Sequence, residues 1–349
     1  MADIKTALLC RGIQLPEYLR TGRRGGAGPA GGRYILVGDT NTLVNVPIYG
    51  HALSSPFLLM KEGETLIVQN GNHSFRATLL PDPSFYENRT AEGIPFRHIA
   101  LLHGTDCLAT TVFQKCIRWR KIPCQFCGIE LSLQSGNTIV RKTPEQLLDV
   151  AHAARSEGVL HVTLTTGTPN ERDKGAQLLA ECASVLSPLF PVHVQIEPVE
   201  RSYLELLKNA GAETIGVHIE TPDEALFRKI CPGKEFHAYG DAWKQAVDIF
   251  GDNQVSSYIL VGLGESHESM VTGIETMVRE GIIPYVVPFR PIAGTSLETH
   301  SPPPERRVSW YARYAAMKMR EYGVDPRKNR AGCVRCGACS PIKEYLRFT

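Results

Sequence analysis

Apolar and polar residues follow two different rhythms along this chain, and the rhythm changes near residue 96. Between Tyr34 and about Pro81, short β-branched runs such as YILVG, TLVNVPIY and ETLIVQN are separated by Gly, Asn, Asp and Pro. Such runs are typical of short strands joined by turns. The pattern therefore predicts a small β-rich N-terminal module over residues 1–95.

From residue 96 onward, strand-like runs alternate with helix-like stretches. The first helix is expected to begin at Thr143, with Pro144 at the first helical position and Gln146 as the reciprocal cap. Six strand-like runs are joined in this way: ATTVFQ, VLHVTLTTG, VHVQIE, TIGVHIE, SSYILVGLG and YVVPFRP. We therefore predict an α/β fold, a partial (β/α)6 barrel over residues 96–300.

The other expected helices cover about 170–187, 200–210, 222–250 and 266–280. A final amphipathic helix over about 304–322 leads into a C-terminal tail that carries cysteines, within residues 301–349. Near the other end, the Gly- and Arg-rich stretch 20–32 has no apolar periodicity. It indicates a mobile loop, with a phosphate-binding patch as the alternative.

The charge balance narrows the classes of partner. With 38 basic and 36 acidic residues, the formal net charge is only +2, which argues against a nucleic-acid-binding surface. A small polar or anionic substrate is the simpler expectation. No run approaches the roughly 20 apolar residues of a membrane helix, and no signal segment opens the chain. We expect a soluble, cytosolic protein without a membrane partner.

The chemically distinctive residues follow the predicted strands. Ligands of such folds bind at the C-terminal ends of parallel strands, so one face of the barrel is expected to carry the chemistry. The residues at the six strand ends, in chain order, are Cys116, the segment TGTP at 166–169, Glu197, Glu220, the segment GLGE at 262–265, and Arg290.

The ten cysteines divide into two groups of three and four scattered residues. A reduced, cytosolic chain of this size needs no disulfide framework. The scattered residues are interpreted as small buried hydrophobic side chains. These four are Cys10, Cys107, Cys182 and Cys231.

The first group has the spacing C-x7-C-x2-C, formed by Cys116, Cys124 and Cys127. Three thiolates on one loop suit an iron–sulfur cluster in which one iron lacks a protein ligand. A zinc site and three unrelated buried cysteines are the alternatives. Cys107 is the nearest competitor as third ligand, but it precedes the ATTVFQ strand and would lie at its opposite end. Phe126 could be an ordinary core aromatic.

This loop resembles the signature of the radical S-adenosylmethionine (SAM) superfamily, which usually reads C-x3-C-x2-C with an aromatic residue before the last cysteine. Cys124-Gln-Phe126-Cys127 matches the second half, whereas the first gap here is seven residues. Further stretches resemble biotin synthase and lipoyl synthase in order and spacing: HIET at 218–221, VGLGES at 261–266 and VPFRPIAGTSLE at 287–298. The resemblance covers residues 96–300. The chain is also similar to an uncharacterised radical SAM family encoded beside nitrilases in bacterial gene clusters.

The resemblance implies that the first cysteine group binds three irons of a [4Fe–4S] cluster, with Phe126 beside it. The amino and carboxylate groups of SAM would chelate the fourth iron, and one electron would release a 5′-deoxyadenosyl radical. An external donor such as flavodoxin or ferredoxin would supply that electron. Gly167 would admit the methionine end of SAM and Thr168 would offer an oxygen acceptor, although TGTPN also suits a helix N-terminal turn.

The resemblance also assigns the nucleoside end of SAM. Glu220 would bind ribose hydroxyls, with a surface glutamate as the alternative, and Glu197 would contact ribose or substrate. Gly262 and Gly264 would pack closely around adenine. Glu265 is expected to cap the following helix, and His218 is given no role.

The second group, Cys333, Cys336 and Cys339, has the spacing C-x2-C-x2-C. It favours an auxiliary [4Fe–4S] cluster over a zinc knuckle without its fourth ligand or a flexible reactive tail. The leading hypothesis is hydrogen abstraction from a small organic substrate, with this cluster donating sulfur or anchoring the substrate. The rivals are a radical rearrangement or carbon–carbon bond formation, in which the tail cluster passes electrons, and a noncatalytic iron–sulfur or zinc scaffold.

Overall fold

The computed structural model describes residues 1–19 and 31–347. The Gly- and Arg-rich stretch predicted as a loop therefore lies outside the described residues, apart from its last two positions. Among the described helices, none is long and apolar enough to cross a bilayer.

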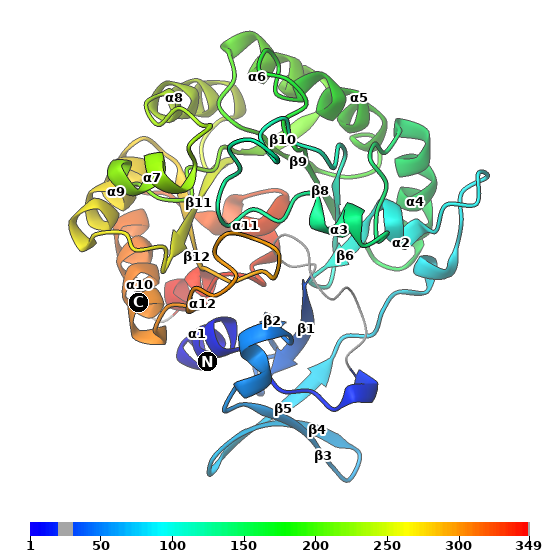
Figure 1. The fold of residues 1–349 in the computed structure, drawn as a ribbon, viewed down its shortest axis with the longest axis vertical. Coiled ribbons are helices and arrows are strands. Elements are labelled where there is room, and N and C mark those ends of the chain that lie inside the picture. Colours follow the sequence, from blue (N-terminus) through cyan, green and yellow to red (C-terminus); the bar gives the residue numbers. More distant parts are fainter. Residues whose placement is uncertain (20–30, 348–349) are drawn as a thin grey trace.

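A curved seven-stranded sheet forms the larger part of the molecule (Figure 1). Its order is β12-β11-β10-β9-β8-β7-β6. Neighbours from β7 to β12 pair in parallel, whereas β6 pairs antiparallel to β7. The strands are β6 (Leu101–His103), β7 (Cys107–Thr111), β8 (His161–Thr165), β9 (Val192–Gln195), β10 (Ala212–Gly216), β11 (Val255–Val261) and β12 (Ile283–Pro288). The predicted partial (β/α)6 barrel is confirmed, with β6 as an unpredicted additional strand.

Helices cover the outer side of this sheet (Figure 1). They are α4 (Pro144–Ser156), α5 (Ala176–Leu186), α6 (Arg201–Asn209), α7 (Glu224–Ile230), α8 (Ala238–Phe250), α9 (His267–Arg279) and α10 (Glu305–Glu321). The short helices α2 (Phe96–Ile99) and α3 (Leu131–Gln134) flank the first βα unit. Thr143 and Gln146 form the predicted capping box at the start of α4.

Two predicted helices differ from the observed ones. The helix expected from about residue 170 begins only at Ala176, because the Asn170 side chain accepts the amide hydrogens of Arg172 and Asp173 and holds a turn there. The stretch expected at 222–250 forms two helices, α7 and α8, because the Pro232-Gly233 turn interrupts it.

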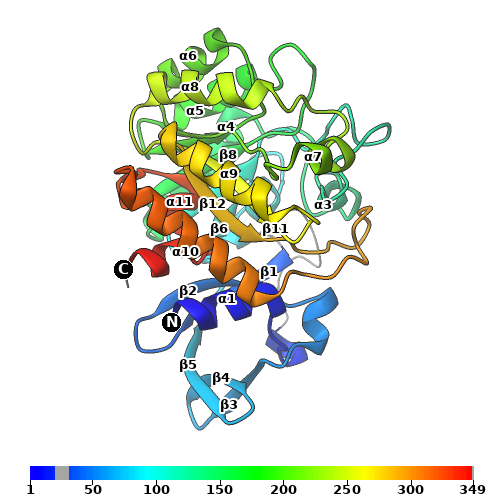
Figure 2. The ribbon, with the colours of Figure 1, turned by 90° about the vertical axis from the view of Figure 1, so that its left-hand side faces the viewer.

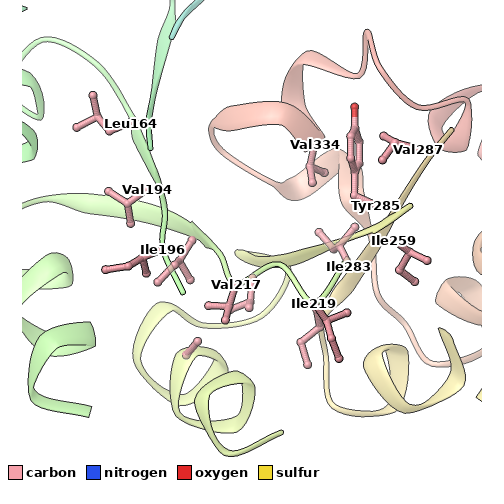
Figure 3. Packing of buried hydrophobic residues seen from close by; sticks show 14 of the residues in the cluster. Leu164, Val194, Ile196, Val217, Ile219, Ile259, Ile283, Tyr285, Val287 and Val334 are labelled. Atoms are coloured by element: carbon pink, nitrogen blue, oxygen red, sulfur yellow. The ribbon is translucent and has the colours of Figure 1, made fainter. Parts of the chain in front are cut away.

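Side chains alternate between the two faces of the parallel strands. Apolar residues such as Leu164, Val194 and Ile259 belong to the main hydrophobic cluster (Figure 3). The intervening positions are largely polar and line the inside of the barrel, as Thr163 and Gln195 do. The barrel therefore has an apolar outer layer and a polar lumen.

The N-terminal module is a separate antiparallel sheet with the order β2-β1-β5-β4-β3. Its strands are β1 (Gly32–Val37), β2 (Thr42–Pro47), β3 (Leu58–Glu62), β4 (Thr65–Asn70) and β5 (His73–Leu79). A helix that was not predicted, α1 (Ala2–Arg11), packs on it and lies beside α10 (Figure 2). Arg313 of α10 pairs with Asp3 of α1 at 2.9 Å.

The module contacts both edges of the curved sheet. Arg290, which follows β12, donates to the Asn45 side-chain oxygen of β2 at 2.5 Å and to the Asn45 carbonyl. At the other edge, the rings of Tyr34 in β1 and His103 in β6 lie 6.2 Å apart. The strand-end arginine thus joins the barrel to the N-terminal sheet.

The C-terminal tail folds against the N-terminal ends of the barrel strands. It contains α11 (Gly332–Cys336) and α12 (Ile342–Arg347), and α11 lies inside the curve of the sheet (Figure 1). Val334 belongs to the main hydrophobic cluster (Figure 3). The predicted domain boundaries at 95 and 300 remain predictions.

Candidate functional site

One cavity of about 420 Å³ occupies the barrel lumen. Cys116, Cys124 and Cys127, on the loop after β7, line it at the C-terminal ends of the strands. Cys333 and Cys339 line it from the tail, which packs at the opposite ends. The two predicted cysteine groups therefore border the same space from opposite sides.

The loop that carries Cys116 continues the pairing of β7 with β8 beyond both strands. Gly167 donates its amide to the Phe113 carbonyl at 2.8 Å, and Ile117 donates to the Thr168 carbonyl at 2.9 Å. A Cβ at Gly167 would lie 2.1 Å from the Lys115 carbonyl oxygen. The absence of a side chain at Gly167 thus lets the cysteine loop approach β8, a reason that differs from the predicted approach of SAM.

Thr168 and Glu197 are brought together next to this loop. The Thr168 hydroxyl donates to Glu197 Oε1 at 2.5 Å, and Arg118 donates to the same oxygen at 2.7 Å. Burial opposes ionisation of Glu197, but the charges of Lys234 and Arg118 outweigh it and lower its pKa. The network ties the cysteine loop to the ends of β8 and β9.

Glu220 has an unusual backbone and an unusual carboxylate. Its φ is 68°, in the left-handed region that non-glycine residues rarely adopt. Its side chain lines the cavity, and burial raises its pKa to about 7. Strained, desolvated groups of this kind cluster at functional sites.

Lys234, which the sequence reasoning missed, lines the same cavity. It belongs to the C-P-G-K turn between α7 and α8, and it is an electrostatic neighbour of Cys124 and Glu197. The only signal in the sequence was a turn of this composition opposite the predicted strand ends.

Gly262 and Gly264 lie in a turn outside the residues that line the cavity. Their φ values are 107° and 108°. The Glu265 carboxylate accepts their amide hydrogens at 3.0 and 3.1 Å and so holds the turn. The expectation that Glu265 caps α9 is wrong: Ser266 is the cap and accepts the amide of Ser269 at 3.1 Å. The adenine contact of the two glycines remains a prediction.

Cys231 is buried in the core, as predicted, and it also contacts the cysteine loop. Its thiol hydrogen-bonds to Cys124 and lowers the pKa of Cys124. Cys231 itself is not among the residues that line the cavity, whereas Cys116 is. The ligand set of Cys116, Cys124 and Cys127 remains a prediction.

In the described part of the chain, no three Cys, His, Asp or Glu side chains converge as the ligands of a single metal ion do. The cysteines of a [4Fe–4S] cluster bind different irons, so they need not converge on one point. Three thiols that border one cavity are compatible with such a cluster.

His218 presents a fixed donor to the lumen. Its ring stacks on Tyr258 with centroids 3.9 Å apart, and its Nδ1 accepts the Tyr258 amide hydrogen at 3.1 Å. Burial lowers the pKa of His218, so the ring is neutral and its proton resides on Nε2. That nitrogen is buried and has no hydrogen-bond partner, although the residue lines the cavity.

Comparisons with known proteins agree with this geometry. The model of the Radical SAM superfamily matches residues 119–276. An uncharacterized protein of Methanocaldococcus jannaschii is 28% identical over 182 residues, which cover 51% of this chain and 48% of that protein. Lipoyl synthase of Vibrio cholerae is 26% identical over 187 residues, covering 52% and 55%. The chain thus spans about half the length of these relatives.

Solved structures support the fold. Methylornithine synthase aligns with a TM-score of 0.51 and 21% identity, covering 63% of this chain and 64% of that one. The family match begins three residues after Cys116 and contains Cys124 and Cys127. Residues 119–276 are a radical SAM domain.

Proposed function

We propose that this chain reductively cleaves SAM at a [4Fe–4S] cluster held by Cys116, Cys124 and Cys127, and abstracts hydrogen from a small polar molecule. The radical SAM domain at residues 119–276 supports cleavage of SAM at an iron–sulfur cluster. When bound, the cluster supplies the electron that breaks a carbon–sulfur bond of SAM. The observation that carries the proposal is the lumen cavity bordered by this cysteine loop.

The residues around the loop suit the charged end of SAM. Lys234 offers a positive charge for its carboxylate, and Glu197 together with Thr168 offers oxygens for its amino group. Arg118 fixes Glu197 in place, since the two side chains form an ion pair at 2.7 Å. The same ion pair attaches the cysteine loop to β9, so the binding of SAM and the position of the cluster are coupled.

Glu220 is proposed to bind the ribose hydroxyls. Its left-handed backbone is strained, and burial disfavours its ionised carboxylate. Two ribose hydroxyl donors would stabilise that carboxylate. Phe126 lines the cavity between the cysteines and supplies an apolar surface beside them.

The substrate is proposed to bind deeper in the lumen, where the polar side chains lie. His218 Nε2 is a buried donor without a partner, and Gln195 and Tyr258 face the same cavity. An unpaired buried donor is costly unless a ligand satisfies it. A small organic molecule with a carbonyl or carboxylate acceptor fits this requirement, and the volume of about 420 Å³ suits a small molecule.

The tail cysteines are proposed to hold a second [4Fe–4S] cluster at the far end of the cavity. Gln195 Nε2 lies 3.5 Å from Cys333 Sγ, so the tail directly contacts the polar lumen. Such a cluster would donate sulfur, anchor the substrate or pass electrons. An external one-electron donor such as flavodoxin or ferredoxin completes the proposal.

The test is anaerobic reconstitution with iron and sulfide, followed by reduction with dithionite in the presence of SAM. We expect 5′-deoxyadenosine to form, and Glu220→Ala to raise the SAM concentration needed for half-maximal formation. A chain that holds its cluster but forms no 5′-deoxyadenosine would contradict the proposal. The matched control is Glu213→Ala, a half-buried glutamate in the same strand region that does not line the cavity.

A further inference from the structure

Cys107 is a buried thiol on the inner face of the barrel. It is the first residue of β7, and its side chain shares a face with Ala109 and Thr111, both of which line the cavity. Its Sγ lies 3.3 Å from the hydroxyl of Thr163, another lumen residue. Cys107 therefore faces inward at the end of the barrel that the tail occupies.

The tail is fixed against the neighbouring strand at the same level. His161 is the register partner of Cys107 in the parallel β7–β8 pair. Its Nδ1 accepts the amide hydrogen of Gly332 at 3.0 Å. Because Gly332 directly precedes Cys333, this bond places the first tail cysteine one strand away from Cys107.

A second contact places Cys336 close to the same strand. Gly104 lies in the turn between β6 and β7, with φ 63°. A Cβ on Gly104 would lie 2.6 Å from Cys336 Sγ, so the sulfur occupies the space beside this turn. The turn is three residues before Cys107 and forms the hairpin in which Cys107 pairs with His103.

Tyr34 lies near these thiols. Its hydroxyl is buried and has no hydrogen-bond partner. Burial raises its pKa, and the next contributions come from Cys339, Cys336, Cys107 and Cys333 in that order. All four thiols are thus electrostatic neighbours of one hydroxyl group.

We propose that Cys107 is the fourth cysteine ligand of the tail cluster, together with Cys333, Cys336 and Cys339. This inference rests on the proposed presence of a cluster in the tail. Four thiolates would occupy all four irons of a [4Fe–4S] cluster and leave none for the substrate. The tail cluster then carries electrons beneath the substrate cavity, and substrate binds through lumen side chains such as His218 instead of through iron.

The experiment isolates the tail cluster in the background Cys116→Ala/Cys124→Ala/Cys127→Ala, which lacks the first site. After anaerobic reconstitution we expect about four irons per chain and no change in the electron paramagnetic resonance (EPR) spectrum on adding SAM. Adding Cys107→Ala should lower the iron content to about three or fewer and yield the spectrum of a three-iron cluster on mild oxidation. Cys107→Ser, which keeps the size of the side chain, should shift the EPR spectrum of the reduced cluster.

Cys182→Ala in the same background is the matched control, because Cys182 is equally buried but lies on the outer helix α5. Equal iron content and identical EPR spectra in the Cys107→Ala and Cys182→Ala proteins would overturn the assignment of Cys107. Absence of iron, or stoichiometric zinc, in the background protein itself would overturn the tail cluster and the inference with it. Thermal unfolding of each variant checks that its fold is intact.

Discussion

Replacing Gly167 with alanine should displace the loop that carries Cys116 while leaving the barrel folded. The new Cβ would lie 2.1 Å from the Lys115 carbonyl oxygen and 3.1 Å from the Phe113 carbonyl oxygen. Ordinary contacts of a Cβ begin at 3.4 Å, so the Lys115 carbonyl must move by more than 1 Å. Backbone atoms cannot rotate away as a flexible side chain can.

The cost follows from the bonds that this movement breaks. Two backbone hydrogen bonds hold the loop on β8: Gly167 to Phe113 at 2.8 Å and Ile117 to Thr168 at 2.9 Å. Each contributes about 1 kcal/mol net, and overpacking adds about 1–3 kcal/mol if the loop resists. If the loop moves, the local loss of about 2 kcal/mol should leave the barrel folded but move Cys116 away from Cys124 and Cys127.

The assay compares iron content and 5′-deoxyadenosine formation in reconstituted Gly167→Ala protein and in a matched glycine variant. Gly240 of α8 is the control, since a Cβ there meets nothing within 4 Å. Gly240→Ala should keep full activity and gain about 0.5–1 kcal/mol of stability. We expect Gly167→Ala to lose iron from the first site and at least tenfold in activity. Wild-type iron content and activity in both variants would show that Gly167 does not set the position of the cysteine loop.

Three further perturbations have defined outcomes. Arg118→Met leaves Glu197, whose side chain is 14% exposed, without its ion pair, and should lower the free energy of unfolding in urea by about 3 kcal/mol. Adding Glu197→Gln to Arg118→Met should recover part of this stability, and an unchanged urea midpoint in Arg118→Met would contradict the prediction. Lys5→Met breaks the buried ion pair with Glu344 at 3.0 Å and should speed proteolysis of the tail. Cleavage of the tail at the wild-type rate would contradict this prediction. Glu220, with its pKa raised from 4.5 to about 7, binds protons more tightly when folded, so folding loses stability as pH rises through this window. Between pH 4.5 and 8, the free energy of unfolding of Glu220→Gln should therefore rise by at most about 3 kcal/mol relative to wild type. Equal slopes of stability against pH in the two proteins would disprove this.

The elements that the sequence predicted well are those with strong local patterns. The capping box at Thr143 and the alternation of apolar strands with helices depend on residues close in the chain, so they survive folding unchanged. The three-residue strand β6 and the helix α1 were missed. Both depend on distant partners: β6 on its pairing with β7, and α1 on its packing against β2 and α10.

The candidate site shows the same division. The position of a cysteine on a strand-to-helix loop can be derived from the sequence, and Cys116, Cys124 and Cys127 do line one cavity. The reason that residue 167 must be a glycine could not be derived from the sequence, because the Lys115 carbonyl that crowds it lies about fifty residues away in the chain. The nearness of Cys107 to the tail could not be derived either, since only the folded tail brings Cys336 next to its hairpin.

Cys116, despite its seven-residue gap, is proposed to complete the first cluster. The most direct measurement is 5′-deoxyadenosine formation by reconstituted Cys116→Ala and Cys231→Ala proteins under identical reduction with SAM. Cys231 is the sharpest comparison, because it contacts Cys124 but does not line the cavity. We expect background formation of 5′-deoxyadenosine by Cys116→Ala and substantial formation by Cys231→Ala. Full activity of Cys116→Ala, with loss in Cys231→Ala, would contradict it.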